Sequence, residues 1–131
     1  EMNLVDAILT TPEGVPHLTL GDQTIKVSEG LGERLGISEG PVKFGIRPQH
    51  LDVCAPGTEN AFSGTVTTVE FLGHEINLHA GVNGESFVAV VPSDRLTAIP
   101  TRGETVALKP HGNRIHLFDR HSEENISLAG L

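Results

Sequence analysis

Histidines are the side chains of this sequence best suited to bind a metal ion or to move a proton at neutral pH, and there are seven. Two runs repeat a spacing of five residues: His74 and His79, then His111, His116 and His121. On a β-strand an odd spacing places side chains on opposite faces, so neither run converges on one ion. His111 and His116 would meet only across a hairpin, and two ligands without a nearby cysteine make a poor zinc site. We therefore expect surface or half-buried histidines and no metal site.

The motifs of nucleotide-binding enzymes and of enzymes with a nucleophilic side chain are absent. No GxxxxGK[ST] phosphate loop occurs, and Gly30-x-Gly32 lacks the third glycine of a dinucleotide-binding loop. Ser63 lies in Phe62-Ser63-Gly64 and not in GxSxG. Cys54 ends an apolar stretch, where a buried, unreactive thiol is the commoner outcome. The sequence predicts a chain that is not an enzyme, holds no cofactor, and neither hydrolyses ATP nor binds it tightly.

Size and charge narrow the class of protein further. The chain has 131 residues, which fits one domain, and a formal net charge of −8. A surface for nucleic acid must neutralise phosphates, and no run of lysine and arginine occurs, so we expect no nucleic-acid partner. The longest apolar run, residues 87–91, is far too short to span a membrane. A single cysteine can form no internal disulfide, which suits a reducing compartment.

Short β-branched segments separated by turn residues predict an all-β fold. Strands are expected over residues 4–9, 17–20, 23–27, 42–47, 63–72, 76–80, 87–91, 105–109 and 114–118. Hairpins are expected at Gly21-Asp22, at Asn83-Gly84 and around residues 110–113. The step of three residues between Val66 and Val69 breaks strict alternation and predicts a β-bulge near Thr67 and Thr68. At most one short helix is expected, near residues 29–35.

Five sequence blocks follow one another in a fixed order: Gly45-Ile46-Arg47-Pro48-Gln49-His50-Leu51, residues 64–75, Val91-Pro92, residues 103–108 and residues 115–119. Together they resemble the C-terminal regulatory domain of ABC importer ATP-binding subunits of the maltose and glycerol-phosphate type. Residues 41–119 resemble its transport-associated, oligonucleotide-binding-like (TOBE) module. Met2-Asn3-Leu4 is similar to the point where that family passes from its ATPase domain into this one.

The resemblance implies a small oligonucleotide-binding-like barrel with additional N-terminal strands. It divides the chain into the N-terminal strands of the regulatory domain over 1–40, the TOBE-like barrel over 41–119 and a polar tail over 120–131. The function that it implies is regulation and dimerisation of the ATP-binding subunit of an importer for sugars or related solutes. ATP and Mg²⁺ would bind to an ATPase domain upstream of Glu1.

The resemblance also implies partners and a location. The partners are a second copy of the subunit, the upstream ATPase domain, the membrane-spanning permease subunits and, in some members, a regulatory protein. The location is cytoplasmic, at the inner face of the cell membrane, through the parent complex.

Most residues of the five blocks have a structural explanation, because glycine and proline shape turns while valine, leucine and phenylalanine fill the core. The polar members Arg47, His50, His74 and Glu75 are the candidate interface residues. We expect two copies to pair through the turn Leu72-Gly73-His74-Glu75, where an apolar side chain stands beside polar groups.

An alternative function is a small-oxyanion-binding module of the molybdate-importer type. Such sites aim backbone N–H groups and Ser, Lys or Arg side chains at the anion. The Ser-Ala-Arg-Asn segment expected ahead of the glycine block is replaced by Glu59-Asn60-Ala61-Phe62-Ser63. This departure and the net charge of −8 both disfavour the alternative.

Overall fold

The computed structural model describes residues 1–27, 39–122, 124 and 126. Throughout these residues the regular elements are β-strands and short 3-10 turns, with no α-helix, so the predicted all-β class is confirmed. The short helix expected near residues 29–35 falls outside the described residues. Within the described ranges, no helix combines the length and the apolar character that crossing a membrane requires.

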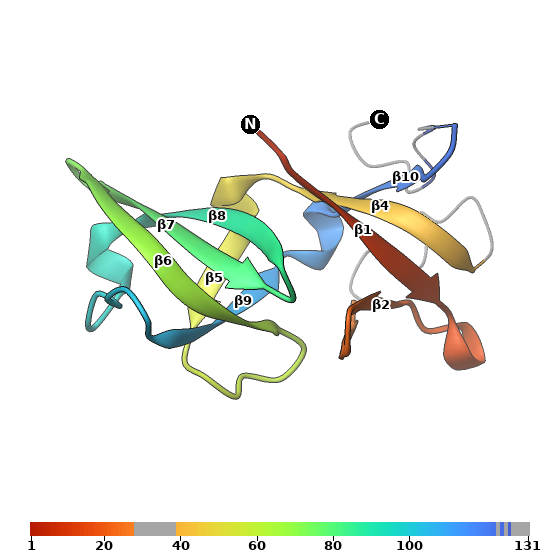
Figure 1. The fold of residues 1–131 in the computed structure, drawn as a ribbon, viewed down its shortest axis with the longest axis horizontal. Coiled ribbons are helices and arrows are strands. Elements are labelled where there is room, and N and C mark those ends of the chain that lie inside the picture. Colours follow the sequence, from red (N-terminus) through yellow and green to blue (C-terminus); the bar gives the residue numbers. More distant parts are fainter. Residues whose placement is uncertain (28–38, 123, 125, 127–131) are drawn as a thin grey trace.

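The strands form two five-stranded antiparallel sheets. The strands are β1 (Asn3–Thr10), β2 (His17–Leu20), β3 (Gln23–Lys26), β4 (Gly40–Ile46), β5 (Leu51–Cys54), β6 (Phe62–Leu72), β7 (Glu75–Val82), β8 (Glu85–Pro92), β9 (Thr105–Pro110) and β10 (His116–Asp119). The first lobe is the sheet β10-β4-β1-β2-β3, and the second lobe is the sheet β5-β9-β6-β7-β8. Figure 1 shows the two lobes side by side. In the second lobe β5 also lies against β8, so that sheet curls towards a barrel.

The chain leaves the first lobe after Ile46 and returns to it at His116. The first lobe is therefore built from both ends of the chain, while the second lobe is one continuous segment. Residues 41–119 contain the whole second sheet together with most of β4 and all of β10 from the first.

The hairpin expected around residues 110–113 is wrong. β9 pairs with β5 and β6 in the second lobe, whereas β10 pairs with β4 in the first, with Leu117 opposite Phe44. Residues 110–115 are thus a crossing between lobes that contains the 3-10 turn η5 (Gly112–Arg114). This pairing is accompanied by burial, since Leu117 of β10 and the preceding Ile115 are both 0% exposed and belong to the core.

The two other hairpins and the bulge are confirmed, whereas β5 was not predicted from the sequence. β2 and β3 are joined through Gly21-Asp22, and β7 and β8 through Asn83-Gly84. Both Asn83 and Gly84 have positive φ, as a two-residue turn matched to the twist of the strands requires. The pairing of β6 with β7 shifts register between Val66 and Thr68, which is the predicted bulge.

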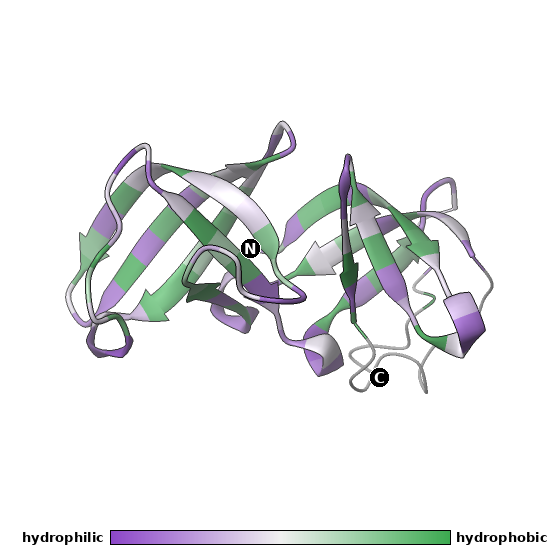
Figure 2. Ribbon diagram, turned by 90° about the horizontal axis from the view of Figure 1, so that it is seen from below, coloured by the Kyte–Doolittle hydropathy of each residue, from purple (hydrophilic) through white to green (hydrophobic). Residues whose placement is uncertain are grey.

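The core is one apolar cluster that runs through both lobes. In β1 the inward side chains Val5, Ala7 and Leu9 alternate with outward ones, and Figure 2 shows such alternating bands on strands of both lobes. The lobes meet at Phe44 of β4, whose ring centroid lies 6.1 Å from that of Phe62 and 6.3 Å from that of Phe87. The two sheets therefore share one hydrophobic core.

Candidate functional site

The structure places the candidate residues in two separate regions. Arg47 and His50 lie where the chain crosses between the lobes. The turn from Leu72 to Glu75 is the tip of the β6–β7 hairpin, at the far end of the second lobe in Figure 1. From the sequence these residues were predicted to be interface candidates together, whereas in the structure they lie in two separate regions.

The first region is the junction, where the chain crosses between the lobes twice. After β4 the turn η3 (Pro48–His50) leads into β5, and after β9 the turn η5 leads back to β10. The crossings lie side by side, because the His111 N–H donates to the His50 carbonyl oxygen at 3.0 Å and the two ring centroids are 5.8 Å apart. Nε2 of His111 also lies 2.9 Å from a carboxylate oxygen of Asp52.

The junction concentrates positive charge around His50. Burial lowers the pKa of His50, and the nearby positive charges of Arg114, His111, Arg47 and His116 lower it further. Nδ1 of His50 is buried and has no hydrogen-bond partner. We call Arg47, His50, His111, Arg114 and His116 the junction cluster. The sequence did not reveal it, because its members come from two crossings that are far apart along the chain.

The lowered pKa of His50 predicts a loss of stability in mild acid. Below the ordinary histidine value of 6.5, the unfolded chain takes up a proton that the folded His50 resists. The unfolded state then binds more protons, so the free energy of unfolding decreases as the pH falls from 6.5 towards the lower folded pKa. We expect urea unfolding to show a smaller decrease between pH 7.5 and 5.5 for His50→Gln than for the unsubstituted chain. The exposed His74→Gln serves as the control, and an unchanged pH dependence in His50→Gln would contradict the prediction.

The second region, the hairpin tip, exposes apolar side chains. Phe71 is 64% exposed and Leu72 is 54% exposed. Gly73 has a φ of +68°, and a Cβ on it would meet no atom within 4 Å. The tip is fixed to the end of β8 by the His74 carbonyl oxygen, which accepts a hydrogen bond from the Ser93 N–H at 2.8 Å. It is therefore an exposed and anchored apolar projection.

An open groove of about 390 Å³ begins beside Phe71. Its walls come from the outer half of β6 and from the segment before β9: Thr67, Thr68, Val69, Phe71, Ile99, Pro100, Thr101 and Arg102. Beyond the bulge, β6 is largely exposed on both faces, because the strand runs past the core. The hairpin tip and this groove form one continuous surface.

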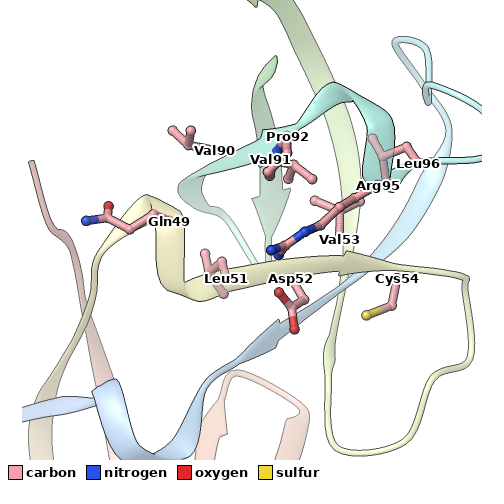
Figure 3. Close-up of a pocket in the computed structure, with 10 residues that line it drawn as sticks. All are labelled: Gln49, Leu51, Asp52, Val53, Cys54, Val90, Val91, Pro92, Arg95 and Leu96. Atoms are coloured by element: carbon pink, nitrogen blue, oxygen red, sulfur yellow. The ribbon is translucent and has the colours of Figure 1, made fainter. Parts of the chain in front are cut away.

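A second hollow, of about 290 Å³, lies between β5 and β8. Figure 3 shows Arg95 reaching across it towards Asp52, with Cys54 at one end. Burial raises the pKa of the Cys54 thiol, and the Asp52 carboxylate raises it further. A raised pKa disfavours the thiolate that a nucleophile requires. Across the described part of the chain, no three His, Cys, Asp or Glu side chains lie close enough together to hold a metal ion.

The sequence analysis missed the polar residues that join the lobes. Asn3 is 8% exposed, and its Nδ2 donates to the carbonyl oxygens of Ile46 at 3.1 Å and Val88 at 2.9 Å. Its Oδ1 accepts the Val88 N–H at 2.8 Å. Asn3 thus bonds β8 of the second lobe to both β1 and the end of β4. The available signal was an asparagine on the inward face of a strand whose other inward residues are apolar.

A second polar link joins the lobes near the β2–β3 turn. Gln23 Oε1 accepts the Ser63 N–H at 2.7 Å, and Gln23 Nε2 donates to the Ser63 carbonyl oxygen at 3.0 Å. Asn83, in the β7–β8 turn, bonds to the same β2–β3 turn, since its Oδ1 accepts from Gln23 at 2.7 Å and its Nδ2 donates to Asp22 at 2.7 Å. Two sets of hydrogen bonds thus hold the lobes in one arrangement.

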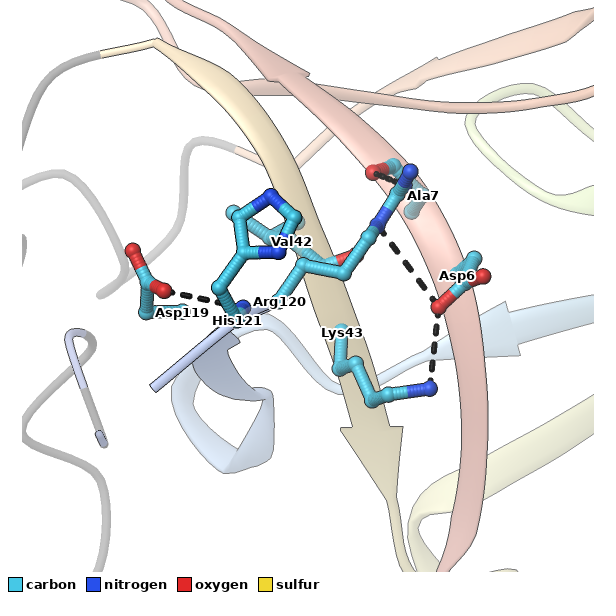
Figure 4. Close-up of polar contacts among 7 residues, drawn as sticks. All are labelled: Asp6, Ala7, Val42, Lys43, Asp119, Arg120 and His121. Atoms are coloured by element: carbon cyan, nitrogen blue, oxygen red, sulfur yellow. Dashed lines mark hydrogen bonds and ion pairs between the residues drawn. The ribbon is translucent and has the colours of Figure 1, made fainter. Parts of the chain in front are cut away.

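Charged side chains next to β10 form hydrogen bonds and ion pairs with β1 in the first lobe (Figure 4). Arg120 donates from Nη2 to the Ala7 carbonyl oxygen at 2.7 Å, and its Nε lies 3.6 Å from Asp6. Lys43 donates to Asp6 at 3.0 Å and lowers the pKa of that carboxyl. Asp119 accepts the N–H groups of Ser122 and His121, and these bonds lower its pKa. These contacts thus hold Arg120, the residue that follows β10, against β1.

Comparison with known proteins shows which family and which relatives this chain resembles. Residues 44–118 match the TOBE domain family. Over 129 residues the chain is 36% identical to the trehalose/maltose import ATP-binding protein MalK of Thermococcus litoralis, covering 91% of this chain and 32% of that protein. The chain therefore spans about a third of the length of this relative.

Among solved structures, the cytoplasmic molybdate-binding protein ModG, in a form with molybdate bound, is similar with a TM-score of 0.67. The similarity covers 88% of this chain and 94% of that one at 15% identity, so it concerns the fold alone. The family match covers more than half of the chain. This chain belongs to the TOBE domain family.

Proposed function

We propose that this chain is the regulatory domain of an ATP-binding subunit of an ABC importer for sugars or related solutes. Two findings support the proposal: membership of the TOBE domain family, and identity to MalK that continues through 91% of the chain. In such a protein ATP and Mg²⁺ bind to a separate ATPase domain, and the present chain is non-catalytic. Its partners are that domain, the permease subunits and a regulatory protein, on the cytoplasmic side of the membrane.

The work of the domain, in this proposal, is to hold two copies of the subunit together through the hairpin tip. The observation that carries this step is the exposure of Phe71 and Leu72, at 64% and 54%, on a chain whose other apolar strand residues are mostly buried. Contiguous exposed apolar surface commonly marks a protein contact. His74, Glu75 and Arg102 supply the polar rim that interfaces usually have around an apolar centre.

The hydrogen bonds between the lobes suit a domain in which a contact made by one lobe must affect the position of the other. Asn3 hydrogen-bonds β1 to β8, and Gln23 hydrogen-bonds the turn of the first lobe to Ser63 of the second. The Asn3 contacts in particular resist sliding of one lobe over the other, because sliding would leave buried or part-buried polar groups unpaired. A contact at the hairpin tip of the second lobe would then be transmitted to β1 in the first lobe.

Self-association is the direct test. We expect weak pairing in sedimentation velocity at high protein concentration, since the patch is smaller than a standard interface. Replacing both Phe71 and Leu72 by serine is expected to raise the dissociation constant at least about tenfold, because removing this apolar area costs more than about 1.4 kcal/mol. Gly73→Asp, which adds a charge at the contact, and Glu75→Lys, which reverses one, should also weaken pairing.

The matched control replaces Leu4 and Ile8, two exposed apolar residues of β1 that are 51% and 38% exposed, by serine. We expect the control to pair as the unsubstituted chain does. Equal weakening in both double variants would show that the tip is not the interface. An unsubstituted chain that stays monomeric at every concentration would show that the domain does not dimerise by itself.

The oxyanion-binding alternative loses support from the contacts of the segment that would hold the anion. Asn60 Oδ1 accepts the Lys26 N–H at 3.3 Å, and both backbone groups of Ser63 bond to Gln23. Phe62 is 1% exposed and packs in the core. The groups at residues 60–63 are therefore used between the lobes, and the likeness to the molybdate-binding protein supports a shared fold alone.

A further inference from the structure

The outer half of β6 has a strand beside it on one side only. β6 pairs with β9 as far as Thr65. The Val66 N–H then donates to the Glu104 carbonyl oxygen at 2.9 Å, and the Gly103 N–H donates to the Val66 carbonyl oxygen at 2.8 Å. Among the described residues, no further main-chain hydrogen bond joins residues 67–72 to the chain on that side. We call this side of residues 67–72 the open edge of β6.

The main-chain groups of Val69 and Phe71 point towards the open edge. A strand that lies between two others bonds to them alternately, residue by residue. Because Val66 bonds away from β7, its partner Ala80 bonds to β8 instead. Leu78, two residues along β7, does the same, so its partner Val69 directs its N–H and C=O away from β7. Phe71 follows two residues later on β6 and has the same orientation.

The strands at the ends of both sheets are covered, in contrast to the open edge. The chain that follows β10 bonds to it, since the Ile126 N–H donates to the Leu117 carbonyl oxygen at 2.8 Å. β3 is held against the second lobe by the Lys26 N–H, which donates to Asn60 Oδ1 at 3.3 Å. β5 and β8 lie against each other. A strand edge without such cover is a template for pairing with another strand.

We propose that the open edge of β6 pairs antiparallel with the same edge of a second copy, so that their second lobes form one continuous sheet. This inference rests on the proposed function, because it specifies how two hairpin tips meet. Main-chain hydrogen bonds would hold the added strand, and its alternate side chains would fill the adjacent surface. The groove of about 390 Å³ beside Phe71 offers space for the Phe71 ring of the second copy.

Charge favours a second copy as the occupant of this edge. Within residues 67–72 the one charged side chain is Glu70, and the one charged side chain of the groove walls is Arg102. Each copy thus brings a negative group to a groove that holds a positive one. A two-fold pair centred on Val69 places Glu70 opposite Thr68 and keeps the two carboxylates apart. The net charge of −8 on each copy opposes pairing, but physiological salt screens it beyond about 8 Å.

Hydrogen exchange at single amides, followed by NMR, tests this arrangement in the unsubstituted chain. Sedimentation measures the fraction of paired chains at each protein concentration. When half of the chains are paired, we expect the Val69 and Phe71 amides to exchange about twofold more slowly than in dilute solution, because only the unpaired half exchanges. The Glu70 amide bonds to β7 at every concentration and should keep one rate.

Val69→Pro, with Val69→Ala as its matched control, removes the main-chain donor on the open edge. Both variants lose the valine side chain, but alanine keeps the N–H. Proline is tolerated in a strand where its N–H would face outward, and circular dichroism checks that both variants fold. We expect the dissociation constant of the proline variant to exceed that of the alanine variant at least about tenfold.

The outcomes separate this inference from the proposed function. Pairing without slower exchange at Val69 and Phe71 would overturn the edge-to-edge arrangement and leave dimerisation through the tip standing. Equal dissociation constants for the proline and alanine variants would overturn it as well. A chain that stays monomeric at every concentration would overturn both. The exchange experiment does not depend on the folding of either variant.

Discussion

Replacing Phe44 with alanine is expected to lower the free energy of unfolding by about 3–5 kcal/mol, the range for deleting a buried phenylalanine ring. The ring is 0% exposed. It comes from β4 of the first lobe and lies 6.1 Å from Phe62 and 6.3 Å from Phe87 of the second. The cavity would open where the two sheets share their core and could not collapse without moving one lobe. Urea unfolding followed by circular dichroism measures the loss.

Phe71→Ala is the matched control for Phe44→Ala, because it deletes the same ring from a position that is 64% exposed. We expect its effect to stay within about 0.5 kcal/mol. If Phe44→Ala and Phe71→Ala lower the free energy of unfolding equally, the core around Phe44 does not hold the two lobes together.

Replacing Asn3 with leucine is expected to cost about 2–4 kcal/mol, although leucine has the same number and branching of heavy side-chain atoms. The substitution leaves the Val88 N–H and the carbonyl oxygens of Ile46 and Val88 without their partner. Each buried polar group left unpaired costs about 1–3 kcal/mol, reduced where water can enter. Because the bonds join β1 and β4 to β8, the substitution loosens the lobes relative to each other. Urea unfolding gives the total cost.

Hydrogen exchange at the Val88 amide distinguishes the loss of the Asn3–Val88 hydrogen bond from a general decrease in the stability of the protein. In Asn3→Leu we expect the Val88 amide to exchange much faster, since its acceptor is gone, while amides inside the β6–β7 ladder change only with global stability. Gln23→Leu is the comparison at the other polar link. That link is exposed, so water replaces its hydrogen bonds and the expected cost is about 1 kcal/mol or less. An unchanged rate at Val88 in Asn3→Leu would contradict the proposed role of Asn3.

Local structure could be predicted from the sequence because its causes are local. Alternation of apolar residues identified β1, and Asn83-Gly84 identified a turn whose positive φ values suit those residues. The uneven step from Val66 to Val69 located the bulge. Each of these follows from backbone sterics and from the two-residue period of a strand. The turn at Leu72-Gly73-His74-Glu75 was likewise predicted, since Gly73 lacks a Cβ and can adopt the positive φ found there.

Strand partners and surface clusters were decided only by the tertiary structure. β10 pairs with β4 and does not form the hairpin that the sequence predicted, and Ile115 and Leu117 are buried there. No local sequence signal indicates which strand β10 pairs with. Exposure of Phe71 depends on how far β6 runs past the core, which the alternation of a single strand does not report. By itself the sequence determined most of the strands, two of the three predicted hairpins and a net negative charge, whereas β5 was not predicted. Packing of the two lobes decided which distant residues meet, and so placed His50 beside His111 from the two crossings of the chain.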